Sequence, residues 1–88
     1  MPRYIIERTA TPELLSNLEE KGRLSAEVVE AMPGVRWIRS YVSEVEGKIY
    51  CEYEAPDPEA VREHARRVGL PVDKISEIAM EVDPAMFR

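Results

Sequence analysis

The stretch from Val35 to Glu54, VRWIRSYVSEVEGKIYCEYE, decides the fold of this chain. Its two halves are rich in aromatic and β-branched residues, which are typical of strands. Glu46-Gly47 lies between them and indicates a tight turn, because glycine accepts the positive φ angles of hairpin turns. The stretch therefore predicts a hairpin with strands over residues 35–44 and 48–54.

A helix is expected on each side of this hairpin. Before it, Thr11-Pro12-Glu13 supplies an N-cap residue, a proline for the first turn and an acid near the positive end of the helix dipole. After it, Asp57-Pro58-Glu59 repeats the pattern, and Gly69 ends the second helix. The first helical region is longer. We expect Gly22 to break it in two, with Ser25 as a second N-cap.

Two further strands are predicted near the ends of the chain, over residues 3–8 and 75–82. The resulting order, β-α-β-β-α-β, is that of the ferredoxin-like fold. A length of 88 residues suits one domain with one modest core. We therefore expect a single α+β domain over residues 1–88, with a four-stranded antiparallel sheet, helices on one face and the other face uncovered.

The charge and hydropathy of the chain argue against two classes of partner. Twelve Lys and Arg stand against 17 Asp and Glu, a net charge of −5, whereas nucleic acids and anionic membranes attract basic proteins. No apolar run approaches the roughly 20 residues that cross a bilayer. The single cysteine, Cys51, excludes an internal disulfide and is typical of a reducing compartment. We expect a cytoplasmic protein that binds neither nucleic acid nor membrane.

Alternation along the hairpin divides its side chains between two faces of the sheet. A two-residue turn at Glu46-Gly47 would put Val42 opposite Cys51. The face expected beneath the helices then carries Ile38, Val42, Ile49, Cys51 and Tyr53. The opposite, uncovered face carries Trp37, Arg39, Tyr41, Tyr50, Glu52 and Glu54.

The uncovered face mixes large aromatic side chains with charges, which is unlike an ordinary solvated surface. One interpretation is a homodimer in which two such faces cover each other. Its interface would contain Trp37, Arg39, Tyr41 and Tyr50. Another interpretation is a small-molecule or metal site on the same face. The two are compatible, because a site can form between two sheets.

His64 is the only histidine and Cys51 the only cysteine. The helical period puts His64 on the side of its helix that faces the sheet, where Cys51 lies beneath. The two could form a thiolate–imidazole pair or donate two metal ligands. They could equally be an inert buried thiol and a histidine bonded to a carbonyl group or water. One His and one Cys do not complete a metal sphere, so carboxylates or a second subunit would have to contribute.

Glu52 and Glu54 point to the same side of their strand, because they are two residues apart. Paired carboxylates serve acid–base chemistry or the binding of hard metal ions. Arg39 and Arg8 are equally suited to neutralise them in ion pairs. Both interpretations stay open at this point.

Several segments resemble a family of short bacterial proteins, once of unknown function and now described as nickel-binding and ferredoxin-like. The resemblance spans nearly the whole chain and is most specific at Cys51-Glu52-Tyr53-Glu54-Ala55-Pro56 and at His64-Ala65-Arg66-Arg67 with Gly69. It also covers Pro2-Arg3-Tyr4-Ile5-Ile6-Glu7-Arg8, Val35-Arg36-Trp37, Ser40-Tyr41-Val42-Ser43 and Gly69-Leu70-Pro71.

The resemblance implies a ferredoxin-like homodimer that binds nickel, and it draws attention to Cys51 and His64. Together with the residue patterns it leads to our first expectation, a cytoplasmic, non-enzymatic homodimer that binds Ni²⁺ or another divalent transition metal. The expected ligands are Cys51, His64, Glu52 and Glu54. A second hypothesis is a dimeric α/β-barrel enzyme that acts on a small organic molecule held between sheet and helices. A third is a non-catalytic interaction module.

Overall fold

Four strands form one antiparallel sheet in the order β2-β3-β1-β4. The computed structural model describes residues 1–88. In it, β1 (Arg3–Thr9) is central, between β3 (Lys48–Glu54) and β4 (Lys74–Glu77), and β2 (Arg36–Ser43) is an edge strand. The predicted ferredoxin-like fold class is thereby confirmed.

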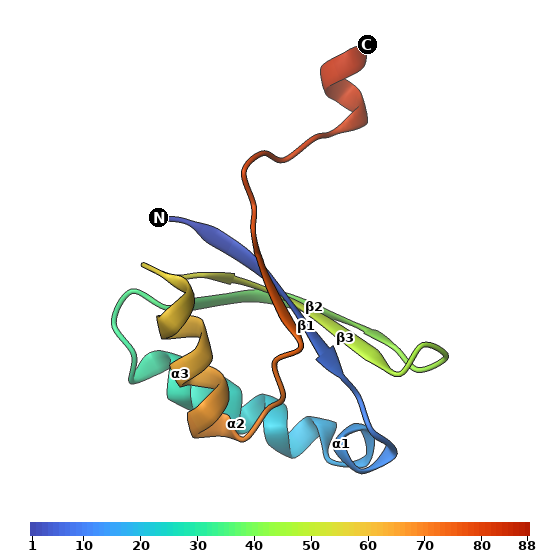
Figure 1. The fold of residues 1–88 in the computed structure, drawn as a ribbon, viewed down its shortest axis with the longest axis vertical. Helices are drawn as coiled ribbons and strands as arrows, with labels where there is room; N and C mark the ends of the chain where they lie inside the picture. Colours follow the sequence, from blue (N-terminus) through green and yellow to red (C-terminus); the bar gives the residue numbers. More distant parts are fainter.

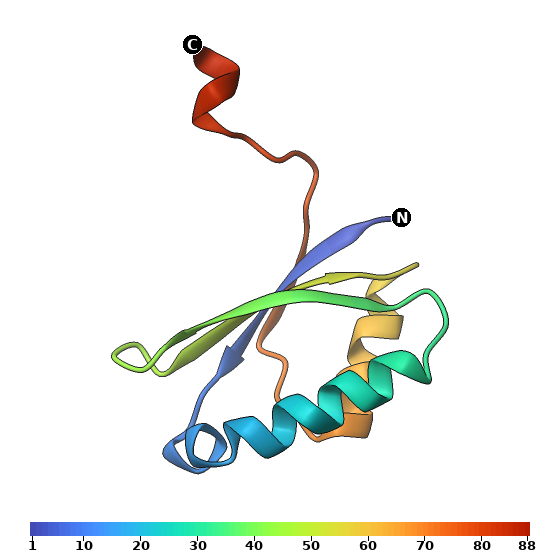
Figure 2. The same cartoon turned by 180° about the vertical axis from the view of Figure 1, so that it is seen from behind.

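Three helices cover one face of the sheet, as Figures 1 and 2 show from opposite sides. They are α1 (Pro12–Ser16), α2 (Leu18–Glu30) and α3 (Pro58–Val68). The predicted caps are present, because Thr11 Oγ1 accepts from the Leu14 amide and the Asp57 carboxylate accepts from the Ala60 amide. No helix of the chain is long and apolar enough to cross a membrane.

The first helical region is broken in two, but the break is at Asn17 and the predicted position at Gly22 is wrong. The Asn17 backbone amide donates to Leu14 O at 3.1 Å and its side-chain amide donates to Glu13 O at 3.0 Å. These bonds satisfy the last carbonyl groups of α1 and end it. Gly22 lies inside α2, and Ser25 is buried in the same helix instead of capping one.

The hairpin between β2 and β3 has a longer turn than predicted. Ser43 pairs with Lys48, so residues 44–47 form the loop, and Cys51 lies opposite Ser40. Gly47 adopts a φ of 64°, and its carbonyl group accepts from the Ala10 amide at 2.8 Å. The register differs from the predicted one by two residues, and an even shift does not by itself move a side chain to the other face.

A bulge in β2 does change the face of two side chains. The pairing shifts between Trp37 and Arg39, so Trp37 lies opposite Tyr53 and packs against the core, and Ile38 is on the uncovered face. The predicted faces of Trp37 and Ile38 are therefore wrong. A bulge adds one residue to a strand and reverses the alternation on one side of it.

The last strand is shorter than predicted, since β4 ends at Glu77 and not near residue 82. The Ile78 amide still donates to Arg3 O at 2.8 Å. Residues 79–88, which we call the C-terminal arm, then leave the body and end in a short 3₁₀ helix, Pro84–Phe87. Figures 1 and 2 show the arm projecting beyond the sheet, away from the helices. Its Met80 and Phe87 side chains are 72% and 76% exposed.

Candidate functional site

A cavity of about 280 Å³ lies on the helix side of the sheet, and we call it the internal pocket. Its walls come from β1, β2, β3 and α2, and from Leu70 beyond α3. The apolar and aromatic lining residues are Leu18, Trp37, Val42, Ile49, Tyr53 and Leu70. Arg8, Lys21, Ser25, Ser40 and Cys51 add polar groups, and no acidic side chain is among the lining residues.

Arg8 is fully buried at this pocket. Its Nε donates to Cys51 Sγ at 3.4 Å, its Nη1 donates to Pro71 O at 2.7 Å, and its Nη2 has no hydrogen-bond partner. The guanidinium carbon lies 5.9 Å from the centre of the Tyr53 ring, a cation–π distance. None of the ion pairs in the structure involves Arg8.

Arg8 lies on a different face of the sheet from the one expected. It was expected beside Glu52 and Glu54, yet it lies on the opposite face of the sheet. Alternation in β1 could have revealed this, because Arg8 shares a face with Tyr4 and Ile6, which are buried.

His64 is fully buried at the sheet-facing side of α3, as predicted. Its Nε2 lies 3.2 Å from both the hydroxyl group and the backbone oxygen of Ser25, and its Nδ1 has no partner. The ring centre is 5.1 Å from that of Tyr53. Burial lowers the pKa of His64 and raises the pKa of Tyr53. Both groups are therefore held neutral at neutral pH.

Cys51 and His64 both lie beneath the helices but form no bond with each other. Cys51 contacts Arg8, whereas His64 contacts Ser25 and Tyr53. A nucleophile needs its base within hydrogen-bond reach. The thiolate–imidazole pair is therefore not assembled in this chain.

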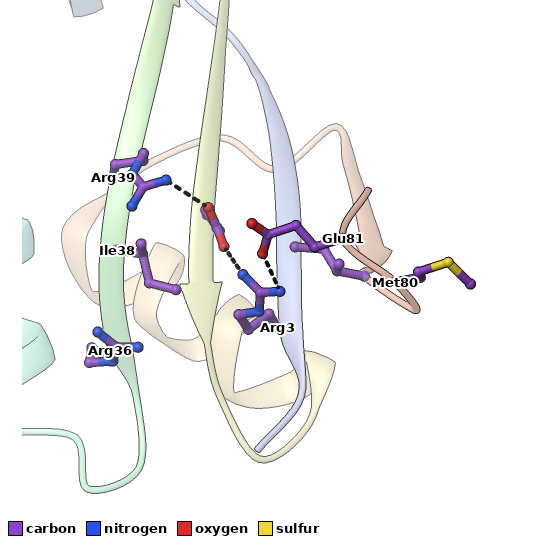
Figure 3. A pocket seen from close by; sticks show the side chains of 8 residues that line it. Arg3, Arg36, Ile38, Arg39, Met80 and Glu81 are labelled. Carbon is purple, nitrogen blue, oxygen red and sulfur yellow. Dashed lines mark hydrogen bonds and ion pairs between the residues drawn. The ribbon is translucent and has the colours of Figure 1, made fainter. Parts of the chain in front are cut away.

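The carboxylates of Glu52 and Glu54 lie on the uncovered side of the sheet, which we call the open face. Glu52 is bonded to Arg3 at 2.8 Å and paired with Arg39 at 3.7 Å, and Arg3 continues to Glu81 of the arm at 2.9 Å (Figure 3). Glu54 pairs with Arg36 at 3.4 Å. These ion pairs surround a second cavity of about 390 Å³. The interpretation of the two glutamates as members of ion pairs is thus realised, with Arg3 in the position expected for Arg8.

The four expected metal ligands divide between the two sides of the sheet. Cys51 and His64 lie beneath the helices, and Glu52 and Glu54 lie on the open face. No group of three or more His, Cys, Asp or Glu side chains in the chain could hold a metal ion. Nickel favours several imidazole, thiolate or carboxylate donors around one ion, so the donors of one subunit alone do not fit it.

Residues 4–78 match the family described as nickel responsive protein SCO4226-like. The chain belongs to this family. The match covers all four strands except the first residue of β1, together with each of the helices that lie on the sheet, and it stops where the C-terminal arm begins. The chain matches none of the curated proteins.

Solved structures resemble this nickel responsive family member in fold. SCO4226 from Streptomyces coelicolor A3(2) has a TM-score of 0.74 at 21% identity, covering 91% of this chain and 99% of that one. Rv0793 from Mycobacterium tuberculosis has a TM-score of 0.56 at 20% identity, covering 96% and 99%. An antibiotic biosynthesis monooxygenase has a TM-score of 0.53 at 19% identity, covering 96% and 100%. At these identities the likeness concerns the fold alone.

Proposed function

We propose that this protein is a cytoplasmic homodimer, formed through the open face, that binds nickel with ligands from both subunits. The observation that carries the proposal is the open face itself. It presents a group of apolar and aromatic side chains that are half-buried or exposed within the subunit and lie under no helix. These are Ile5, Ile38, Tyr41 and Tyr50.

The C-terminal arm supports the homodimer. It projects beyond the sheet with Met80, Val82, Met86 and Phe87 exposed. Exposed apolar surface of this kind is commonly buried against a partner. We propose that the partner is a second copy of the chain, because its open face carries the same apolar side chains. Contact between the two faces would bury both sets.

The nickel part of the proposal rests on the family description and on the donor count. One subunit lacks three suitable donors in one place, whereas two open faces in contact would bring two copies of Glu52 and Glu54 to one interface. Two chains of net charge −5 also repel each other, and a bound cation would reduce that repulsion.

The dimer is tested by sedimentation equilibrium. We expect a mass of twice 10.1 kDa and at least a tenfold weaker self-association for Tyr41→Ser, which removes a ring that is 62% exposed. Val45→Ser is the matched control, because Val45 is fully exposed at the hairpin tip. A wild-type monomer at micromolar concentration would overturn the proposed dimer.

The metal is tested by calorimetric titration with Ni²⁺ at neutral pH. We expect heat from the dimer, and loss of that heat in the double variant Glu52→Gln, Glu54→Gln. Cys51→Ser is the comparison on the other side of the sheet and should bind as wild type does. Absence of heat with Ni²⁺, Cu²⁺, Co²⁺ and Zn²⁺ would refute the proposed metal binding, and loss in Cys51→Ser alone would move the site beneath the helices.

Two other functions remain as alternatives to nickel binding. An interaction module would dimerise without releasing or absorbing heat on titration with metal ions, so the calorimetric titration separates it from the first proposal.

An enzyme acting on a small organic molecule is favoured by one observation, the internal pocket. Because no nucleophile and base meet there, we propose binding and not catalysis at that pocket.

A further inference from the structure

We infer that the internal pocket binds a small organic anion, a carboxylate with an aromatic or aliphatic body, and that Arg8 pairs with its charged group. This inference goes beyond the proposed nickel site, because it concerns the opposite side of the sheet and a different class of ligand. It rests on the charge, the free nitrogen and the apolar walls of the pocket.

The charge of Arg8 is the first argument. A guanidinium keeps its proton in proteins, so this side chain stays cationic even when fully buried. A buried charge is normally paired with an opposite charge, since leaving water is costly. Arg8 forms no ion pair within the chain. Its charge helps to lower the pKa of Asp73, but that carboxylate is bonded to Thr9 and Lys48. An anion from outside the chain would supply the missing partner.

The geometry of the guanidinium is the second argument. Two of its nitrogens already donate within the chain, Nε to Cys51 Sγ and Nη1 to Pro71 O. The third nitrogen, Nη2, is buried without a partner. Its N–H groups have no acceptor in the chain, and a carboxylate bound in the pocket that Arg8 lines would supply one. The ring of Tyr53 and the bond to Pro71 hold the guanidinium in position before any ligand arrives.

The rest of the pocket selects the body of the ligand. Six apolar or aromatic side chains line it, and Trp37 is kept in place by a 2.9 Å bond from its Nε1 to Ser40. A volume of about 280 Å³ is near the lower end of ligand pockets, which suits an acid of about ten non-hydrogen atoms. Lys21 adds a second cation, and the lack of acidic lining residues disfavours cationic ligands.

A matched pair of probes tests the inference on the wild-type protein. Phenylacetate carries the charge, and phenylacetamide has nearly the same shape without it. Trp37 is the only tryptophan and lines the pocket, so its fluorescence reports binding directly. We expect phenylacetate to change the fluorescence and to bind at least tenfold more tightly than the amide. Equal affinities, or no response to phenylacetate, would overturn the inference.

Inorganic phosphate separates an organic acid from a simple anion. We expect phosphate to bind at least tenfold more weakly than phenylacetate, because it leaves the apolar walls without contacts. Phosphate binding as tight as that of phenylacetate would overturn the assignment of an organic body.

Arg8→Met removes the charge and keeps most of the side-chain volume. We expect this variant to lose the fluorescence response to phenylacetate and to melt, without ligand, no lower than wild type. Arg62→Met, at an exposed position of α3, is the matched control and should respond as wild type does. An unchanged response in Arg8→Met would overturn the role of Arg8. If that variant does not fold, the comparison of acid and amide on the wild-type chain decides.

Discussion

At the scale of single residues, the fold buries two basic side chains beneath its helices in different ways. His64 gives up its charge, because burial lowers its pKa and outweighs the bond to the Ser25 carbonyl group, which raises it. Arg8 keeps its charge, because a guanidinium does not lose its proton. The first residue therefore makes folding depend on pH, and the second makes the internal pocket electropositive.

We expect the thermal stability of the protein to fall between pH 7 and pH 5 because of His64. The unfolded chain takes up a proton near the ordinary histidine pKa of about 6.5, whereas the folded chain resists it. Lowering the pH through that value favours the unfolded state. The groups near the ring do not titrate in this interval, since they are Ser25, Tyr53 and Arg8. Melting temperatures measured across the interval should fall less steeply for His64→Gln.

The nearby Glu63 does not disturb this measurement. Arg66 and Arg67 bond its carboxylate and hold its pKa at about 2. The ionised Glu63 stabilises the folded chain, and this stabilisation is complete above its usual pKa of 4.5. It is lost only as the pH falls from 4.5 towards 2, which is below the interval tested. Equal slopes for the wild-type chain and His64→Gln would contradict the role assigned to His64.

At the scale of elements, Gly22 and Gly69 were both expected to end a helical segment, but only Gly69 does so. Gly69 ends α3 with a φ of +82°, in the left-handed region that other residues rarely adopt. Gly22 continues the right-handed backbone of α2, and a Cβ atom there would meet nothing within 4 Å. A residue with a Cβ atom is therefore disfavoured at position 69, at the end of α3, and accepted at position 22, inside α2.

We expect Gly22→Ala to raise the free energy of unfolding by about 0.5–1 kcal/mol, because alanine loses less backbone freedom on forming a helix. Urea denaturation with a shared slope measures the change. A lower stability would show that Gly22 is needed at the wall of the internal pocket.

Gly69→Ala is expected to act in the opposite direction, with a loss of about 1 kcal/mol, because a Cβ atom is disfavoured at this φ. The new Cβ would also approach Lys21 Nζ at 3.1 Å, although that flexible end can move. The same denaturation series provides the measurement. Equal and favourable effects at both glycines would contradict the left-handed conformation at Gly69.

At the scale of the whole molecule, the two sides of the sheet differ in what they lack. The helix side is covered and contains the internal pocket with its unpaired cation. The open face has paired charges and uncovered apolar groups, and the C-terminal arm extends beyond it. We propose a small anion for the first side and a partner subunit for the second, and the two proposals are independent because they concern opposite faces of the sheet.

We expect a chain shortened to residues 1–78 to remain folded but to dimerise at least tenfold more weakly. Residues 79–88 bury no side chain within the subunit, and their one ion pair, Arg3 with Glu81, is exposed and of small value for stability. Thermal unfolding and sedimentation equilibrium measure the two effects. A full-length variant with Met80, Met86 and Phe87 changed to Ser should weaken dimerisation similarly. Undiminished dimerisation of the shortened chain would exclude the arm from the interface.

The sequence by itself determined the order of the strands and helices of this protein and the inward position of His64, although not every boundary. Alternation in strands, the caps at Thr11 and Asp57 and the stop at Gly69 are local properties, so they can be recognised from neighbours along the chain. The helical period likewise settled which side of α3 faces the sheet. The ferredoxin-like order follows from these elements, and the structure has it.

Only the tertiary structure decided the hairpin register, the bulge that turns Trp37 inward and the burial of the Arg8 charge. Each depends on contacts between residues far apart in the chain, such as Gly47 with Ala10 or Arg8 with Pro71. The separation of Cys51 from Glu52 and Glu54, in contrast, follows from alternation along one strand, and the structure has these residues on the predicted faces. The candidate metal residues could be proposed from the sequence, but the internal pocket could be found only in the folded chain.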